Sequence, residues 1–181
     1  MAEVLLSVAV LAIALQLGVD VLFPTIRLAD RETRRAQNGQ NGLLCITRLE
    51  TDFQRATADS IQFSAGDQES LIVLRQLDNV TADGQQVWAD ELVLYWWHSK
   101  TLKRATLKAQ SSRPRYFNQT EMAALRDSVS SWRQVCDSLQ SLEISLQGSL
   151  VSLRIEVREP HTDRVLKPLT LSRQFFLRNN S

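Results

Sequence analysis

Histidine and cysteine, the residues best suited to acid–base, nucleophilic or metal chemistry, are scarce in this chain of 181 residues. Both histidines, His98 and His161, fall in segments predicted to be turns, where they are expected to be ordinary turn residues. The chain contains no nucleophile elbow, no paired-histidine zinc motif, no phosphate-binding glycine loop and no dinucleotide-binding fingerprint. We therefore expect a protein that is not an enzyme and that holds no metal ion or cofactor.

The two cysteines, Cys45 and Cys136, allow two interpretations. They form no CxxC pair, and together with two distant histidines they make a poor zinc set. In an oxidising compartment they can form one disulfide. As free thiols they would instead serve as small, half-buried apolar side chains. Their spacing does not choose between these states, so the pair is kept as a candidate disulfide.

Charge and aromatic residues do not indicate a nucleic-acid partner. The net charge is only +1 and the arginines are scattered along the chain, so no strongly basic face is expected. The run Tyr95-Trp96-Trp97 lies in a predicted strand, where consecutive side chains point to opposite faces. These rings cannot form one stacking platform, and we expect them to pack in a core.

The elements that must position any functional residue begin with a long N-terminal helix. An apolar run from Val4 to Ile26 follows Glu3, and it continues into an amphipathic stretch, 27–58. The uncharged part, 4–19, would span roughly 24 Å as a helix, somewhat short of the ~30 Å hydrocarbon core. No basic residue precedes the run, as one would in a cleaved signal peptide, so a retained anchor is predicted.

The amphipathic stretch is predicted to form the second half of the same helix. Gly39 and Gly42 each weaken a helix by about 1 kcal/mol relative to alanine, which predicts a kink or local break there. Apolar residues at approximately helical spacing should face a core: Leu44, Ile46, Leu49, Phe53 and Ala56.

Beyond Ala58 the apolar period changes from helical to two, which predicts a β-rich domain over 59–181. A short helix or irregular crossover is expected over 118–132, capped by Asn118 or Thr120. The predicted fold class is α+β, with a spine helix packed on a mostly antiparallel β domain. Roughly six to eight strands are expected, including 60–64, 70–77, 91–98, 102–107, 141–147, 151–157 and 169–177.

Four stretches together resemble one family. They are EVLLSVAVLA at 3–12, LETDFQ at 49–54 with Arg48 ahead of it, LVLYWWHSKTLKR at 92–104 and LTLSRQFFLRN at 169–179. The chain resembles the type IV pilin-like proteins, and among them the J-type minor pseudopilins of type II secretion. The resemblance implies a single-pass inner-membrane protein with a periplasmic β domain. Its implied partners are other pilin-like subunits, which it would join at or near a filament tip, and membrane lipid before assembly.

The resemblance also implies a role for Glu3. It would match the family's glutamate at the fifth mature position, which pairs with the N-terminal amine of a neighbouring subunit during assembly. Opposite charges attract strongly at low dielectric, and each offsets the other's desolvation. Taken alone, Glu3 is better explained as a solvated acid that favours the positive end of a helix dipole.

The start of the chain departs from the family pattern. The family has a basic leader ending in glycine, whereas only Met1 and Ala2 precede Glu3 here. We expect an upstream start that supplies this leader; loss of processing is the alternative. Without a leader, the arginines that follow the apolar run, at 27, 31, 34 and 35, would place the β domain in the cytoplasm. A membrane-anchored binding or sensor module that does not assemble remains the alternative function.

Overall fold

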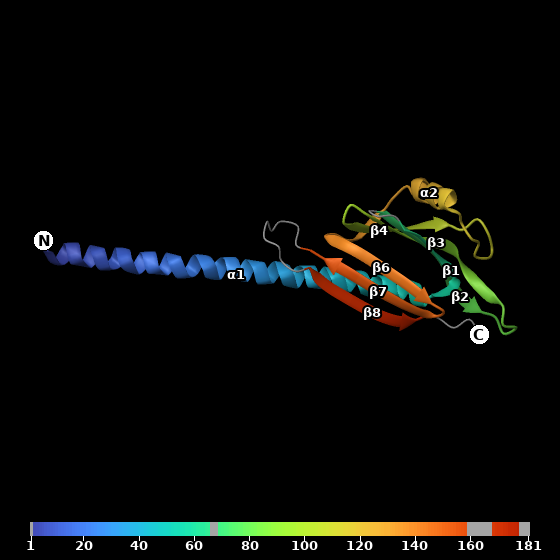
Figure 1. Ribbon diagram of the computed structural model, residues 1–181, viewed down its shortest axis with the longest axis horizontal. Coiled ribbons are helices and arrows are strands. Elements are labelled where there is room, and N and C mark those ends of the chain that lie inside the picture. Colours follow the sequence, from blue (N-terminus) through green and yellow to red (C-terminus); the bar gives the residue numbers. More distant parts are fainter. Residues whose placement is uncertain (1, 66–68, 159–167, 178–181) are drawn as a thin grey trace. The chain divides into compact units, whose positions relative to one another are not determined.

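The computed structural model describes residues 2–65, 69–158 and 168–177 (Figure 1). The chain divides into two compact units, residues 1–37 and 38–181. The described part of the first unit is entirely helical. The second unit contains the remainder of that helix, all the described strands and a second, shorter helix.

Helix α1 runs without interruption from Ala2 to Gln54. It continues through Pro24, Gly39 and Gly42, so the helix has no break at the glycines. The helix also ends before the predicted boundary at 58. The reason is that the Arg55 carbonyl already accepts a hydrogen bond of 2.6 Å from the Leu77 amide, which joins the chain to a sheet.

The first sheet, sheet A, has five strands in the order β1-β2-β3-β4-β5, each antiparallel to its neighbours. The β3–β4 hairpin closes where His98 pairs with Thr101, as predicted. The two residues between them, Ser99 and Lys100, have positive φ, as a tight hairpin turn requires. The strands are β1 (Ala56–Ala65), β2 (Glu69–Val80), β3 (Gln86–His98), β4 (Thr101–Lys108) and β5 (Arg133–Cys136).

The second sheet, sheet B, has three antiparallel strands in the order β6-β7-β8. Its inward-facing side chains alternate along β7 with exposed or half-buried ones, which is the period that the sequence predicts. Gly148 has a φ of 60° in the β6–β7 turn, a left-handed conformation that suits glycine. The strands are β6 (Leu139–Gln147), β7 (Leu150–Val157) and β8 (Leu169–Phe176).

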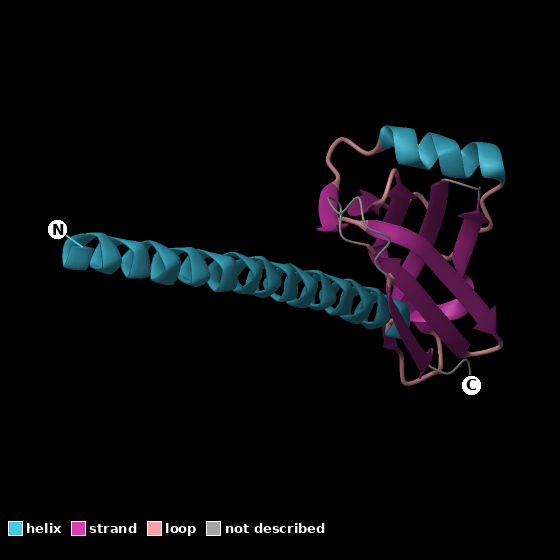
Figure 2. Cartoon of the chain, turned by 60° about the vertical axis from the view of Figure 1, so that its left-hand side comes forward, coloured by secondary structure: helices cyan, strands magenta, loops and turns pink. Residues whose placement is uncertain are grey.

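Helix α2, Gln119–Ser128, packs on the face of sheet A opposite to α1 (Figure 2). Asn118 caps it: its side chain accepts a hydrogen bond from the Glu121 amide at 2.9 Å. The Glu121 carboxylate in turn accepts one from the Asn118 amide, also at 2.9 Å. This reciprocal capping box selects Asn118 over Thr120 as the cap.

The main core joins the C-terminal part of α1 to both sheets. Buried α1 side chains recur at helical spacing, and they meet apolar residues of β2, β3, β7 and β8. Leu44, predicted to face the core, is exposed, and its neighbour Cys45 is buried instead. The other predicted core residues of this stretch are buried, namely Ile46, Leu49, Phe53 and Ala56.

The predicted fold class is confirmed: a long helix packs against antiparallel β-sheets in an α+β domain. One strand was missed, the four-residue β5. The turn predicted at 160–163, with His161, lies outside the described residues, as do Gly66 and Asp67 of the turn predicted after β1.

Candidate functional site

The N-terminal half of α1 carries a continuous apolar surface. Large apolar side chains lie on all sides of the helix, and each is at least 46% exposed. Each would gain about 1.5–3 kcal/mol on leaving water. A helix that is apolar all round needs lipid or other protein to cover it. We call the following residues the apolar helix surface: Val4, Leu6, Val8, Val10, Leu11, Ile13, Leu15, Leu17, Val19, Val21, Leu22, Phe23 and Ile26.

By length and composition, α1 is able to cross a membrane. Asp20 and Pro24 lie inside the apolar helix surface, and the arginines that follow it are exposed. Arg34 pairs with Asp30 one turn earlier at 2.9 Å. This charged turn suits the boundary between hydrocarbon and water, where arginine side chains reach the headgroups.

Glu3 lies in the first turn of α1 and is exposed. Its backbone carbonyl accepts a hydrogen bond from Ser7 Oγ at 2.9 Å. Within the described part of the chain, no basic group lies within 4.0 Å of its carboxylate. The carboxylate therefore stands at the positive end of the helix dipole and is open to a partner.

The opposite end of α1 is held by a buried carboxylate, Asp52, which is only 4% exposed. Its Oδ2 accepts hydrogen bonds from Tyr95 Oη at 2.6 Å and from Arg104 Nε at 2.7 Å. Its Oδ1 accepts one from Gln76 Nε2 at 3.1 Å, and Arg48 Nε lies 3.9 Å from Oδ2. We call these five residues the Asp52 cluster; it joins α1 to β2, β3 and β4.

Burial and charge set the protonation of this cluster. Burial raises the pKa of Tyr95, and the neighbouring Asp52 charge raises it further, so the phenol stays protonated. Burial lowers the pKa of Arg104, but its hydrogen bond to Asp52 and the attraction of that carboxylate outweigh burial, and the net shift is upward. The Arg104 guanidinium therefore stays charged beside Asp52.

Strand β8 makes the second set of contacts with α1. Arg173 Nε pairs with Glu50 Oε2 at 2.9 Å. A Cβ added to Gly42 would lie 2.7 Å from Leu171 Cδ1 and 3.2 Å from Val157 Cγ2. Gly42 thus allows sheet B to approach the helix closely, which explains a glycine inside a continuous helix.

The candidate cysteines are brought together by the fold. Cys45 on α1 and Cys136 at the end of β5 are both buried in the same core cluster. Both are free thiols in the structure. Sequence spacing could not show that both lie in this cluster, because β5 was not predicted.

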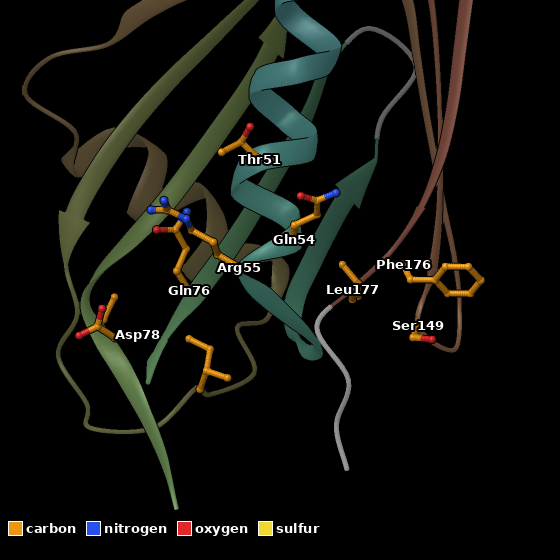
Figure 3. A pocket seen from close by; sticks show the side chains of 10 residues that line it. Thr51, Gln54, Arg55, Gln76, Asp78, Ser149, Phe176 and Leu177 are labelled. Carbon is orange, nitrogen blue, oxygen red and sulfur yellow. The ribbon is translucent and has the colours of Figure 1, made fainter. Parts of the chain in front are cut away.

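A wide, open cavity of about 1210 Å³ lies at the end of α1 (Figure 3). Its lining includes one carboxylate, Asp78, and one guanidinium, Arg55, but no imidazole or thiol. Its residues come from the α1 end, β2, β3, the β6–β7 turn and the β8 end: Thr51, Gln54, Arg55, Gln76, Leu77, Asp78, Ala89, Ser149, Phe176 and Leu177. The cavity therefore offers no nucleophile–base pair.

The histidine and the aromatic residues of β3 make packing contacts. His98 stacks on Trp96, with ring centroids 5.3 Å apart. Trp96 packs on the α2 side of sheet A, whereas Tyr95 is buried on the α1 side, so the predicted division of consecutive aromatics is confirmed. Among the described residues, no group of three or more histidine, cysteine or acidic side chains could hold a metal ion.

The long N-terminal helix packs on antiparallel sheets through its C-terminal part and exposes an apolar N-terminal part. The architecture is pilin-like. Comparison with models of known protein families and with curated proteins finds no match to this chain.

The resembling stretches meet in this pilin-like architecture. The 49–54 stretch supplies Asp52, and the 92–104 stretch supplies Tyr95 and Arg104. The 169–179 stretch supplies Arg173 and Leu171, which contact α1. Their pairing depends on the fold and cannot be obtained from the separate stretches of sequence.

Proposed function

We propose that this chain is a minor pseudopilin-like structural subunit of a type II secretion or type IV pilus-type machine. It is a single-pass protein of the bacterial inner membrane before assembly, with its β domain in the periplasm. It joins other pilin-like subunits by helix packing, near the filament tip. In this role it is a structural component and not an enzyme.

The observation that carries this proposal is the difference in burial between the two halves of α1. From Gly42 to Phe53 the helix buries one face against both sheets, so this half belongs to its own domain. The apolar helix surface has no such cover and is exposed on every side. Lipid covers it before assembly, and apolar helices of neighbouring subunits cover it afterwards.

Glu3 supplies the specific step in this proposal. Its exposed carboxylate, at the start of the apolar helix surface, pairs with the N-terminal amine of a neighbouring subunit. At low dielectric each charge offsets the desolvation of the other, so the pair favours one register between the two helices.

Co-purification of the tagged full chain from native membranes tests the assembly proposal. Wild type should retain partners that themselves begin with an apolar helix. Glu3→Gln should reduce their recovery at least tenfold, equivalent to a loss of about 1.4 kcal/mol. Glu32→Gln is the matched control, because it neutralises another exposed acid on α1, and it should retain the partners.

The alternative function is a membrane-anchored periplasmic binding or sensor module. The open cavity at the end of α1 favours it, because that cavity could receive a ligand. It predicts that no pilin-like chain co-purifies and that Glu3→Gln behaves like wild type. Two C-terminal fusions determine the side of the membrane, one to alkaline phosphatase and one to a reporter that is active only in the cytoplasm. The alkaline phosphatase fusion is expected to be active. Activity of the cytoplasmic reporter alone would contradict periplasmic placement.

A further inference from the structure

A second cavity, of about 260 Å³, lies on the α2 side of sheet A. Its walls come from β2, β3, β4, α2 and the segment 109–117 that joins β4 to α2. It is more enclosed than the cavity at the end of α1 and shares no lining residue with it. Nothing in the proposed assembly of the chain uses this cavity.

The cavity contains a buried arginine, Arg75, which is only 3% exposed. Side chains two residues apart in a strand lie on the same face of a sheet. Leu71 and Val73, the preceding residues on this face of β2, are both buried in the apolar core under α2. A guanidinium therefore continues a row of buried apolar side chains, and burying a charge is costly unless it is paired.

The hydrogen bonds of Arg75 hold its guanidinium in place without offsetting its charge. Its Nε donates to the Ala89 carbonyl at 2.9 Å, and its Nη1 donates to the Ser111 carbonyl at 2.6 Å. Both acceptors are neutral. Among the described residues, no carboxylate forms an ion pair with Arg75, and its Nη2 has no acceptor. The charge is fixed in position and lacks a counter-ion.

Arg104, on the other face of sheet A, shows how the domain treats a guanidinium that it pairs itself. Its Nε lies 2.7 Å from the buried Asp52 carboxylate, and its pKa is raised. The pKa of Arg75 is lowered instead, because burial outweighs the attraction of Asp90. A bound anion would do for Arg75 what Asp52 does for Arg104.

The rest of the cavity wall also favours an anion. None of the described residues that line it is acidic, whereas three exposed ones are basic: Lys108, Arg113 and Arg115. Glu121 pairs with Arg115 at 3.2 Å, and Glu91 lies opposite Lys108 in the β3–β4 pairing. The excess positive charge therefore lies on Arg113 and on the buried guanidinium.

Apolar side chains form the remainder of the lining, among them Leu107, Phe117 and Leu125. An inorganic anion would leave this surface unused, whereas an apolar body would gain free energy by covering it. The volume is just below the ~300 Å³ at which pockets for drug-sized ligands begin, so it suits a small molecule.

We propose that this cavity binds a small organic carboxylate. The carboxylate accepts hydrogen bonds from the Arg75 guanidinium, whose Nη2 is left for it, and Arg113 attracts it to the entrance. Its apolar body packs against Phe117 and Leu125. The site is built from one domain alone, so the inference does not rest on the proposed assembly function.

Equilibrium dialysis of the purified full chain in detergent, with radiolabelled hexanoate as the probe, tests the site. Saturable binding of one hexanoate is expected, measured against compartments that contain detergent only. Unlabelled hexanamide should compete at least about tenfold more weakly than unlabelled hexanoate, because a hydrogen bond to a charged group is the stronger one. Inorganic phosphate should also compete more weakly, because it has no apolar body. Equal competition by hexanamide, stronger competition by phosphate or no saturable binding at millimolar concentration would overturn the proposal.

Three arginine variants place the ligand within the domain. Arg75→Gln should weaken hexanoate binding at least about tenfold through loss of the charged donor. Arg113→Gln removes an exposed cation and should weaken binding severalfold without affecting the fold, so the test does not depend on Arg75→Gln folding. Arg133→Gln is the matched control, because Arg133 is equally exposed but lies outside the lining. Wild-type affinity in both Arg75→Gln and Arg113→Gln would overturn the site.

A fourth variant separates this site from the cavity at the end of α1. Arg55 is the guanidinium of that other cavity, and it is exposed. Arg55→Gln should bind hexanoate as tightly as wild type does. Loss of binding in Arg55→Gln, with binding retained in Arg75→Gln, would place the carboxylate in the other cavity and contradict the proposal.

Discussion

Asp52 on α1 and Arg104 on β4 are joined by a hydrogen bond of 2.7 Å across 52 positions of sequence. The carboxylate is buried, and Tyr95 and Gln76 complete its hydrogen bonding. A buried carboxylate is costly unless it is paired and hydrogen bonded, and here both conditions are met. This contact fixes the rotation of the spine helix against the central hairpin of sheet A.

Replacing Asp52 should therefore destabilise the domain strongly. Asp52→Asn keeps the shape but leaves Arg104 without its carboxylate. We expect a loss of about 3 kcal/mol in unfolding free energy, at the lower end for a broken buried ion pair because Arg104 keeps some contact with water. Urea unfolding followed by tryptophan fluorescence measures it.

Glu143→Gln is the matched control for that measurement. It removes an acid that is 67% exposed in its side chain and lies 4.0 Å from Arg154. The change should stay within about 0.5 kcal/mol. Equal losses for the two variants would show that the Asp52 cluster has no special role in stability.

Alkaline pH should destabilise the domain through Tyr95. Its pKa is raised in the folded state, so the unfolded chain ionises first, near its ordinary value of about 10. The contribution of Tyr95 to the free energy of unfolding is unchanged below that pH. It should fall by up to about 1.4 kcal/mol per pH unit as the pH rises above it.

Two phenylalanine variants isolate the Tyr95 effect in unfolding experiments between pH 8 and 11. Tyr95→Phe should flatten the loss at high pH, although it should also be less stable at neutral pH because the hydrogen bond to Asp52 is gone. Tyr116 is 83% exposed, so Tyr116→Phe should retain the wild-type slope. An unchanged slope in Tyr95→Phe would contradict the buried, protonated phenol.

The two glycines of α1 in the second unit should respond to alanine with opposite signs. At Gly39 the new methyl group would meet Leu169 Cδ2 at 3.5 Å, an ordinary contact, so Gly39→Ala should stabilise by about 0.5–1 kcal/mol through helix propensity. At Gly42 it would crowd Leu171 and Val157, and we expect a net loss of about 1 kcal/mol. Thermal unfolding of both variants checks the signs; stabilisation by Gly42→Ala would disprove the close approach of sheet B.

The cap of α2 should be specific to Asn118. Asn118→Ala removes the acceptor for the Glu121 amide and should cost about 1 kcal/mol. Thr120→Ala changes an exposed residue two positions after Asn118 and should be close to neutral. Guanidinium unfolding compares the stability of the two variants. A larger loss of stability in Thr120→Ala would contradict Asn118 as the cap.

Periodicity in the sequence was enough to predict most of the fold. The alternation around Val151 and Ile155 and the β3–β4 hairpin depend on neighbouring residues, and the structure confirms both. Local sequence signals predicted the structure less well where tertiary contacts determine it. Gly39 and Gly42 predicted a break because helix propensity cannot show that β8 needs a close approach to the helix.

The contacts of the candidate site were harder to predict. Asp52, Tyr95 and Arg104 all lie in stretches that carry the family resemblance. Pairing them requires knowing which face of β3 meets which face of α1. Strand β5 is too short for an alternation to be visible, so the place of Cys136 in the core could not be predicted. Long-range register is the information that one sequence lacks.

In the proposed function, the apolar helix surface packs against like helices of other subunits. Incorporating a photo-crosslinking amino acid at Leu11, which lies exposed within that surface, tests it in native membranes. Irradiation followed by mass spectrometry should identify protein adducts whose attachment points lie in N-terminal apolar helices of pilin-like chains. Adducts with lipid alone, under conditions in which the secretion or pilus machine is assembled, would contradict this packing between subunits.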